Sequence, residues 1–156
     1  MPRSWRITKA KYAATAFDGE GARASGGRWN SPGIRIVYTA ESRSLATLEI
    51  LVHLNNSLLL SKYVLIPVDF PAESVMTLDT GSLPPNWRSY PSPPELQQLG
   101  DEWAKGQNSV VLQVPSIVVY GESNFLLNPD HPEFPSKVVV SSPQPFELDL
   151  RRLKTK

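Results

Sequence analysis

Gly26-Gly27-Arg28-Trp29-Asn30-Ser31-Pro32-Gly33 is the most unusual stretch of this 156-residue sequence. Three glycines, a proline, an arginine and a tryptophan fall within eight residues, which is more than a turn requires. Glycines let a backbone approach a ligand closely, and an arginine there can bind a phosphate through two parallel hydrogen bonds. A structural interpretation also fits, in which Trp29 packs into the core and Arg28 pairs with a carboxylate.

Regular elements are predicted on both sides of this stretch. Trp5–Thr8 is a candidate strand, whereas the Gly-rich segment from Asp18 to Gly33 is expected to be a loop. Ile34–Thr39 is β-branched and aromatic, which favours a strand. Ser42 can cap a helix that extends to Leu54, and its apolar residues on several faces predict that this helix is well buried.

The remainder of the chain contains more predicted strands than helices. Ser92-Pro93-Pro94-Glu95 is typical of a helix start with Ser92 as the cap, and this helix should run to about Lys105 and stop at Gly106. Because the elements do not alternate regularly as β-α-β, the sequence indicates one mixed α+β domain over residues 1–156, with a core from about 3 to 153. Strands are expected at Tyr63–Phe70, Val110–Val114, Ile117–Tyr120, Val138–Ser141 and Phe146–Leu148.

Composition and charge exclude several classes of protein. The chain has no cysteine, so it can form no disulfide framework and no thiolate metal site. The net charge is +1, and only 151–156 is locally basic, so nucleic-acid binding by this chain is not expected. No apolar run resembles a secretory signal or reaches the roughly 18 residues that span a bilayer. We therefore expect a cytoplasmic protein that does not bind membranes.

Three common types of functional site are not supported by the surrounding sequence. Residues 19–24 match the dinucleotide pattern G-x-G-x-x-A, but the glycines and proline that follow should prevent the required helix. His53 and His131 have no spacing typical of a metal site, so no metal is expected. Neither Ser116 nor Ser123 lies in a nucleophile elbow, which argues against a serine hydrolase.

Glu49 is the second unusual feature, because it lies inside the apolar stretch Leu45–Val52. A carboxylate in such surroundings is costly unless it is paired, solvated in a cleft, or protonated. Two interpretations stay open: a salt bridge to Arg28 or Arg6 or a contact with His53, and a functional carboxylate in a pocket.

Considered together, these segments resemble one family over nearly the whole chain, least distinctively over residues 71–108. The match consists of Trp5-Arg6-Ile7, Phe17-Asp18-Gly19-Glu20-Gly21-Ala22, the Gly26–Gly33 stretch, Val37-Tyr38-Thr39-Ala40, Leu45-Ala46-Thr47-Leu48-Glu49, Val114-Pro115-Ser116 and residues 124–132. In the identity and order of these residues the sequence is similar to RES-domain proteins, a family named for an Arg, a Glu and a Ser. Arg28 and Glu49 match the first two, and we favour Ser116 over Ser123 for the third.

The resemblance implies a fold like that of ADP-ribosyltransferases, with a split, bent β-sheet around an NAD+ cleft. It implies a toxin of a bacterial toxin–antitoxin system that depletes NAD+ by cleaving the bond between nicotinamide and ribose, or alternatively transfers ADP-ribose to a protein. The implied partner is an Xre-type antitoxin that covers the active site. A non-catalytic interaction module is a more distant alternative. Whether the chain forms a homodimer or a hetero-oligomer with the antitoxin is left open.

The resemblance also assigns roles to individual residues. Arg28, Tyr38, Glu49 and Ser116 are the expected catalytic residues. Arg28 would hold phosphate, Tyr38 would form an aromatic wall, and Glu49 would stabilise the cation that forms as the glycosidic bond breaks. NAD+ as the substrate would be contacted by Arg6, Arg28, Trp29, Tyr38, Ser123 and Asn124, and the acceptor could be water, phosphate or a protein.

Overall fold

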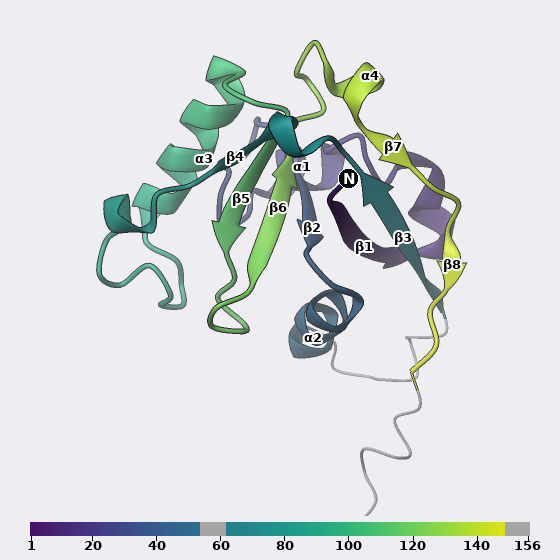
Figure 1. Ribbon diagram of the computed structural model, residues 1–156. Coiled ribbons are helices and arrows are strands. Elements are labelled where there is room, and N and C mark those ends of the chain that lie inside the picture. The colour runs from purple at the N-terminus through teal and green to yellow at the C-terminus, as the bar shows by residue number, and fades with distance from the viewer. Residues whose placement is uncertain (54–61, 149–156) are drawn as a thin grey trace, which may run out of the picture.

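One mixed sheet forms the centre of the molecule (Figure 1). The computed structural model describes residues 1–53 and 62–148, so the predicted helix end at Leu54 and the basic segment 151–156 lie outside it. Within the described ranges the sheet order is β4-β5-β6-β2-β1-β3-β7, with β8 also paired to β3. All pairs are antiparallel except β4–β5. The strands are β1 (Arg3–Lys9), β2 (Val37–Ala40), β3 (Tyr63–Asp69), β4 (Val75–Thr77), β5 (Val111–Pro115), β6 (Ser123–Leu127), β7 (Val139–Val140) and β8 (Gln144–Pro145).

The helices lie around this sheet, with α3 along the β5 side and α2 next to the end of β2 (Figure 1). The predicted α+β class is therefore confirmed. The α-helices are α1 (Glu20–Ser25), α2 (Arg43–His53), α3 (Pro94–Gly106) and α4 (Phe134–Lys137), and the short 3-10 helices are η1 (Ala10–Thr15), η3 (Ala72–Ser74) and η4 (Thr80–Ser82). No helix in the described ranges is long and apolar enough to cross a membrane.

The core has two parts that matter for the site. Trp103 of α3 packs with Leu112, Leu126 and the buried ring of Trp29, so the structural role predicted for Trp29 is correct. Leu45 and Ala46 of α2 pack with Trp5 of β1 and with Ala40, the last residue of β2. These two apolar clusters hold α3 and α2 against opposite parts of the same sheet.

Two expectations about helices are wrong. The Asp18–Gly33 segment is not all loop, because α1 forms over the residues of the G-x-G-x-x-A match and ends where Gly26 adopts a φ of 74°. Helix α2 is capped by the Ser42 hydroxyl as predicted, which accepts from Leu45 N at 3.0 Å. It is not well buried, however, because Leu48 is 43% and Val52 is 62% exposed.

The start of α3 also differs from the prediction. Pro93, not Ser92, is the N-cap residue, and no side chain caps the helix. The predicted end is nearly right, because α3 includes Gly106 and terminates with Gln107 in the left-handed region. Pro94 is the first helical residue, and it keeps the preceding Pro93 in the extended region, which fixes the N-cap position one residue after Ser92.

Several strand predictions need correction. The segment Ile117–Tyr120 does not continue the strand, because Ser116 Oγ accepts hydrogen bonds from the backbone of Val118 and Val119 and turns the chain. The second predicted strand begins at Val37 instead of Ile34, and the last lies at Gln144–Pro145 instead of Phe146–Leu148. Strands β4 and β6 were not predicted; β6 was considered only for its motif residues.

Candidate functional site

A cavity of about 790 Å³ lies where β1, β2, α1 and α2 meet. This volume is within the range of small-molecule sites. Among the residues expected to act on a ligand, the following line it: Arg6, Arg28, Trp29, Tyr38, Glu49 and Asn124. The fold therefore gathers six side chains that are up to 118 positions apart in sequence (124 − 6) around one space.

The Gly26–Gly33 stretch is held at the cavity by hydrogen bonds to its backbone. Trp29 N donates to the hydroxyl of Tyr38 at 2.9 Å, and that hydroxyl donates to Asn30 Oδ1 at 2.7 Å. A Cβ on Gly27 would lie 2.7 Å from the same hydroxyl, so only glycine fits there. Burial raises the pKa of Tyr38 well above its ordinary value, which keeps the phenol protonated.

Helix α3 supports this stretch from the other side. Gln97 Nε2 donates to the carbonyls of Gly27 and Asn30, and Ser31 N donates to Asp101 Oδ1. Sequence reasoning missed both side chains. Their spacing of four residues on one face of an amphipathic helix was the available signal.

Arg28 lines the cavity without a carboxylate partner in the described residues. Its two terminal nitrogens donate to the carbonyls of Trp87, at 3.1 Å, and Ser89, at 3.2 Å. Partial burial lowers the pKa of Arg28 from its usual value, but a guanidinium remains charged. The predicted structural alternative, a carboxylate pair, is not what the structure shows. A guanidinium with donors still unused can bind an anion.

Glu49 reaches the cavity from α2 and is held by Asn124 of β6. Asn124 Nδ2 donates to Glu49 Oε2 at 2.7 Å and to the carbonyl of Thr39 at 3.1 Å. Burial raises the pKa of Glu49, and the Asn124 hydrogen bond opposes that rise. None of the salt bridges among the described residues involves Glu49, so the pairing with Arg28 or Arg6 is absent.

Arg6 brings a second positive charge to the same cavity. Its Nη1 donates to the carbonyl of Tyr38 at 2.9 Å, whereas its Nε is buried and has no partner in the described residues. Burial lowers the pKa of Arg6, and the nearby carboxylate of Asp18 opposes this effect. A buried donor without an acceptor is costly, which indicates a place for an anionic or polar ligand.

The two candidate family serines form hydrogen bonds outside the cavity lining. Ser116 is 1% exposed and shapes the turn whose Ile117 and Val118 line the cavity. Ser123 Oγ accepts from Gln113 Nε2 at 3.1 Å, and its backbone N–H donates to Glu41. Neither side chain lines the cavity, so the direct ribose contact expected of Ser116 is not part of this geometry.

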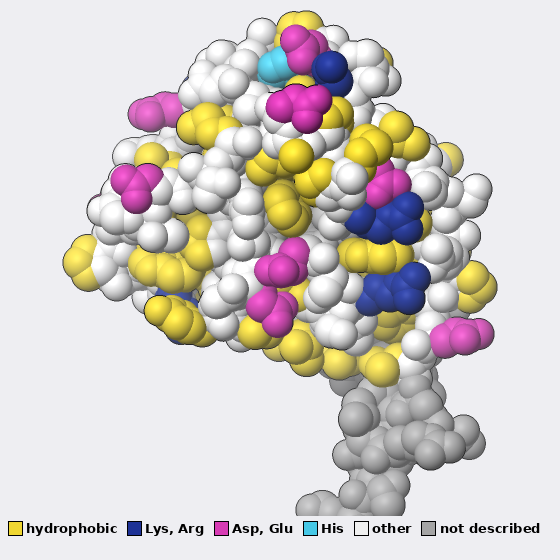
Figure 2. All heavy atoms as spheres, in the orientation of Figure 1, with side chains coloured by type: hydrophobic (Ala, Val, Ile, Leu, Met, Phe, Trp, Pro, Cys, Tyr) yellow, Lys and Arg dark blue, Asp and Glu magenta, His cyan; other side chains and the backbone are white. Residues whose placement is uncertain are grey.

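The described ranges contain no group of three His, Cys, Asp or Glu side chains able to hold a metal ion. On the face drawn in Figure 2, acidic and basic side chains form small separate groups and no continuous basic stripe.

Comparison with known proteins identifies the family. The model of the RES domain matches residues 3–149. The chain belongs to the RES-domain family. A "Toxin Res" from Yersinia enterocolitica is 40% identical over 147 residues, covering 94% of this chain and 97% of that protein. A "Prs ADP-ribosylating toxin" from Sphingobium sp. is 41% identical over 134 residues, covering 83% of each chain.

A solved structure shows the same fold. The M. tuberculosis MbcT–MbcA toxin–antitoxin complex contains a chain that matches with a TM-score of 0.72 at 22% identity, over 92% of this RES-domain chain and 83% of that chain. The predicted bent α+β sheet is thus shared with a known toxin structure. The family model and the relatives show that the chain is a RES-domain protein, similar over most of its length to proteins that are named as toxins.

Proposed function

We propose that this RES-domain toxin consumes NAD+ by breaking the bond between nicotinamide and ribose, with water as the acceptor. One observation carries the proposal: Glu49, held by Asn124, shares a cavity with the cationic side chains of Arg6 and Arg28. Cleavage of a glycosidic bond passes through an oxocarbenium-like state. A fixed carboxylate next to that carbon and cations next to the pyrophosphate are the two requirements of such a reaction.

In this mechanism Glu49 stabilises the positive charge that develops on the ribose. Asn124 occupies Oε2, so Oε1 is left to accept from a ribose hydroxyl or to orient the attacking water. Apolar neighbours such as Ile50 and Val118 line the same cavity and lower the local dielectric constant. Charge stabilisation is stronger in such surroundings than in water.

The two arginines bind the pyrophosphate in this proposal. Arg28 has unused N–H donors beside those that hold Trp87 and Ser89, and Arg6 has the unpartnered Nε. Tyr38 contributes a ring edge or face at the nicotinamide end, while its hydroxyl accepts from Trp29 N and donates to Asn30 Oδ1 and so holds the residues that follow Arg28. Because NAD+ is a cytoplasmic metabolite, the toxin would act in the cytoplasm.

Protein ADP-ribosylation is the second candidate, and it is favoured by the similarity to the ADP-ribosylating toxin of Sphingobium. Both reactions break the same bond between nicotinamide and ribose, and they differ only in the group that accepts the ADP-ribose. Incubation of the toxin with cell extract and NAD+ labelled in its adenylate distinguishes the two. Free labelled ADP-ribose supports hydrolysis, ADP-ribose 1″-phosphate supports phosphate as the acceptor, and labelled protein supports transfer.

Glu49→Gln tests the proposal directly. It keeps the size of the side chain but removes the charge, so NAD+ turnover should fall about 100-fold or more while the protein still folds. Glu95→Gln, which changes an exposed carboxylate in α3, is the matched control and should turn over NAD+ like the unaltered chain. Turnover of the Glu49→Gln protein within a few-fold of the original would rule out this role.

The partner proposed for this toxin is an Xre-type antitoxin that covers the cavity. The MbcT–MbcA structure is of a toxin with its antitoxin, which supports a protein partner for this fold. A guanidinium that accepts phosphate also accepts a carboxylate, so an antitoxin chain end could occupy the place of the pyrophosphate beside Arg28.

A further inference from the structure

Part of the cavity lining has no role in the proposed reaction. This arm comes from η1 and the start of α1 and includes Tyr12, Thr15, Asp18 and Gly19. Strand β1 connects it to the region of Glu49, because Trp5 packs against α2 whereas η1 begins directly after Lys9. With the scissile bond at Glu49, the rest of a dinucleotide would run along β1, past Arg6, to this arm.

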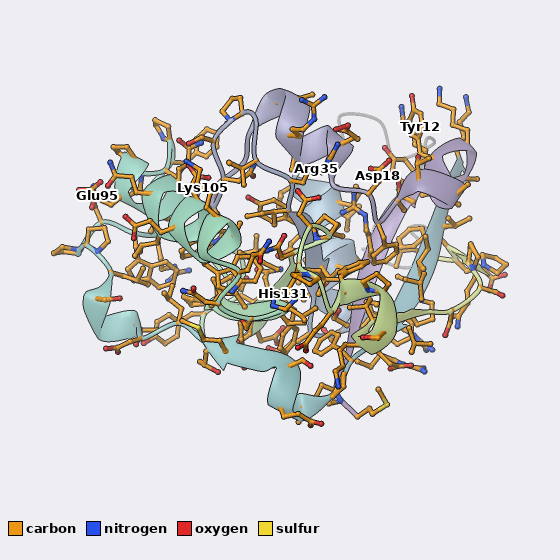
Figure 3. All side chains as sticks on the ribbon, turned by 90° about the horizontal axis from the view of Figure 1, so that it is seen from above. Tyr12, Asp18, Arg35, Glu95, Lys105 and His131 are labelled. Carbon is orange, nitrogen blue, oxygen red and sulfur yellow. The ribbon has the colours of Figure 1, made fainter. Side chains whose placement is uncertain are left out.

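The side chains of this arm are available to a ligand. Tyr12 lines the cavity and is 52% exposed. Lys11 Nζ lies over its ring, 5.1 Å from the centroid, so a planar group would stack on the other face. Asp18 is exposed, and its Oδ1 accepts from Glu20 N at 2.9 Å, which leaves Oδ2 free. No salt bridge among the described residues includes Asp18. Figure 3 shows Tyr12 and Asp18 near each other on the same side of the molecule.

The charges around Asp18 determine which ligands suit this arm. Arg35, whose Cβ packs against Gly19, already pairs with Glu20 at 3.4 Å and with Asp130 at 3.2 Å. The Asp18 carboxylate therefore lines the arm with two cations near it. Arg6, whose charge interacts with that of Asp18, is assigned to the pyrophosphate by the proposed function, and Lys11 Nζ lies 5.1 Å from the centroid of the Tyr12 ring. A carboxylate in a nucleotide site accepts from the ribose hydroxyls and repels a 2′-phosphate.

We propose that Tyr12 and Asp18 form an adenosine subsite that selects NAD+ over NADP+. Tyr12 stacks on the adenine, and Asp18 Oδ2 accepts hydrogen bonds from the 2′- and 3′-hydroxyls of the adenosine ribose. The orientation of the dinucleotide rests on the proposed function, because that function places the nicotinamide ribose at Glu49. The recognition of adenosine can be tested without turnover.

The test measures binding of ADP-ribose and of ADP-ribose 2′-phosphate by calorimetry. The unaltered chain should bind ADP-ribose at least about 10-fold more tightly, because the 2′-phosphate faces a like charge. Asp18→Asn keeps Oδ1 for Glu20 N and should reduce this preference to about 3-fold or less. Tyr12→Ala should weaken both ligands about 10-fold, whereas Tyr12→Phe should not. Glu102→Gln, an exposed carboxylate of α3 outside the cavity, is the matched control and should keep the preference.

A turnover measurement separates failure of this subsite from failure of the proposed function. Nicotinamide mononucleotide contains the scissile bond without the adenosine, so Tyr12→Ala should slow NAD+ consumption but leave that of the mononucleotide unchanged. The subsite proposal is wrong if Asp18→Asn keeps the full preference for ADP-ribose over ADP-ribose 2′-phosphate. It is also wrong if the original chain does not bind ADP-ribose. A preference that depends on Asp18 in a chain that does not consume NAD+ supports the subsite and ends the proposed function.

Discussion

At the scale of single residues, the hydrogen bond from Asn124 to Glu49 is expected to control the pH dependence of turnover. Burial raises the pKa of Glu49 and this bond lowers it. Turnover needs the carboxylate, so it should rise with pH through the pKa of Glu49. Asn124→Leu removes the donor, raises the pKa further, and should move the acid limb of the kcat profile to higher pH.

Asn128 provides the matched control, because it is a buried asparagine whose Nδ2 donates to the carbonyl of Ala104. Asn128→Leu should lower the melting temperature without moving the acid limb. If Asn124→Leu loses stability but keeps the original pH profile, Asn124 is only structural.

Arg28 is the second residue whose type should matter. Arg28→Lys retains one positive charge but loses the planar set of donors that hold the Trp87 and Ser89 carbonyls and a phosphate together. The Kd for ADP-ribose should rise about 10-fold or more. Arg23→Lys, in an exposed pair with Glu20, should bind as the original does. Unchanged calorimetric affinity in Arg28→Lys would leave Arg28 with a structural role alone.

At the scale of elements, helix α3 supports the Gly26–Gly33 stretch that contains Arg28. A Cβ on Gly100 would lie 1.7 Å from the carbonyl oxygen of Trp29, so the helix touches that backbone directly. Gly100→Ala should therefore cost at least about 2 kcal/mol of unfolding free energy, because neither backbone can yield. Chemical denaturation followed by circular dichroism measures this cost.

Gly21→Ala is the appropriate comparison, since a Cβ there meets nothing within 4 Å and the residue lies inside α1. It should leave stability unchanged or raise it by up to about 1 kcal/mol. Equal denaturation midpoints for Gly100→Ala and the original chain would show that α3 can move away from Trp29.

At the scale of the whole molecule, the proposed antitoxin would act by blocking access to one cavity. If the antitoxin fills the cleft beside Arg28, Arg28→Ala should lose ADP-ribose binding and part of its antitoxin affinity. Tyr38→Phe and Ser116→Ala should reduce turnover more than they weaken the complex. Titration of purified antitoxin with NAD+ turnover as the readout tests this, and a complex that still consumes NAD+ at the free rate excludes inhibition by occlusion.

The amino-acid sequence alone determined the class of fold and most of the residues that are proposed for the site. Local signals are sufficient for β1, β3, the Ser42 cap of α2 and the end of α3 near Gly106, since these depend on neighbouring residues. The resemblance identified Arg28, Tyr38 and Glu49, and all three line one cavity.

Only the tertiary structure decided how these residues are held and which faces are buried. Strand β4 has only three residues and forms because it pairs with β5, so no local sequence pattern predicts it. The exposed Val52 of an apolar helix and the buried Ser116 likewise depend on what packs against them. Glu49 and Asn124 are 75 residues apart, and their contact exists because the register of β2 and β6 pairs Ala40 with Asn124 beside the start of α2. Such distant pairings are set by the packing of the complete chain.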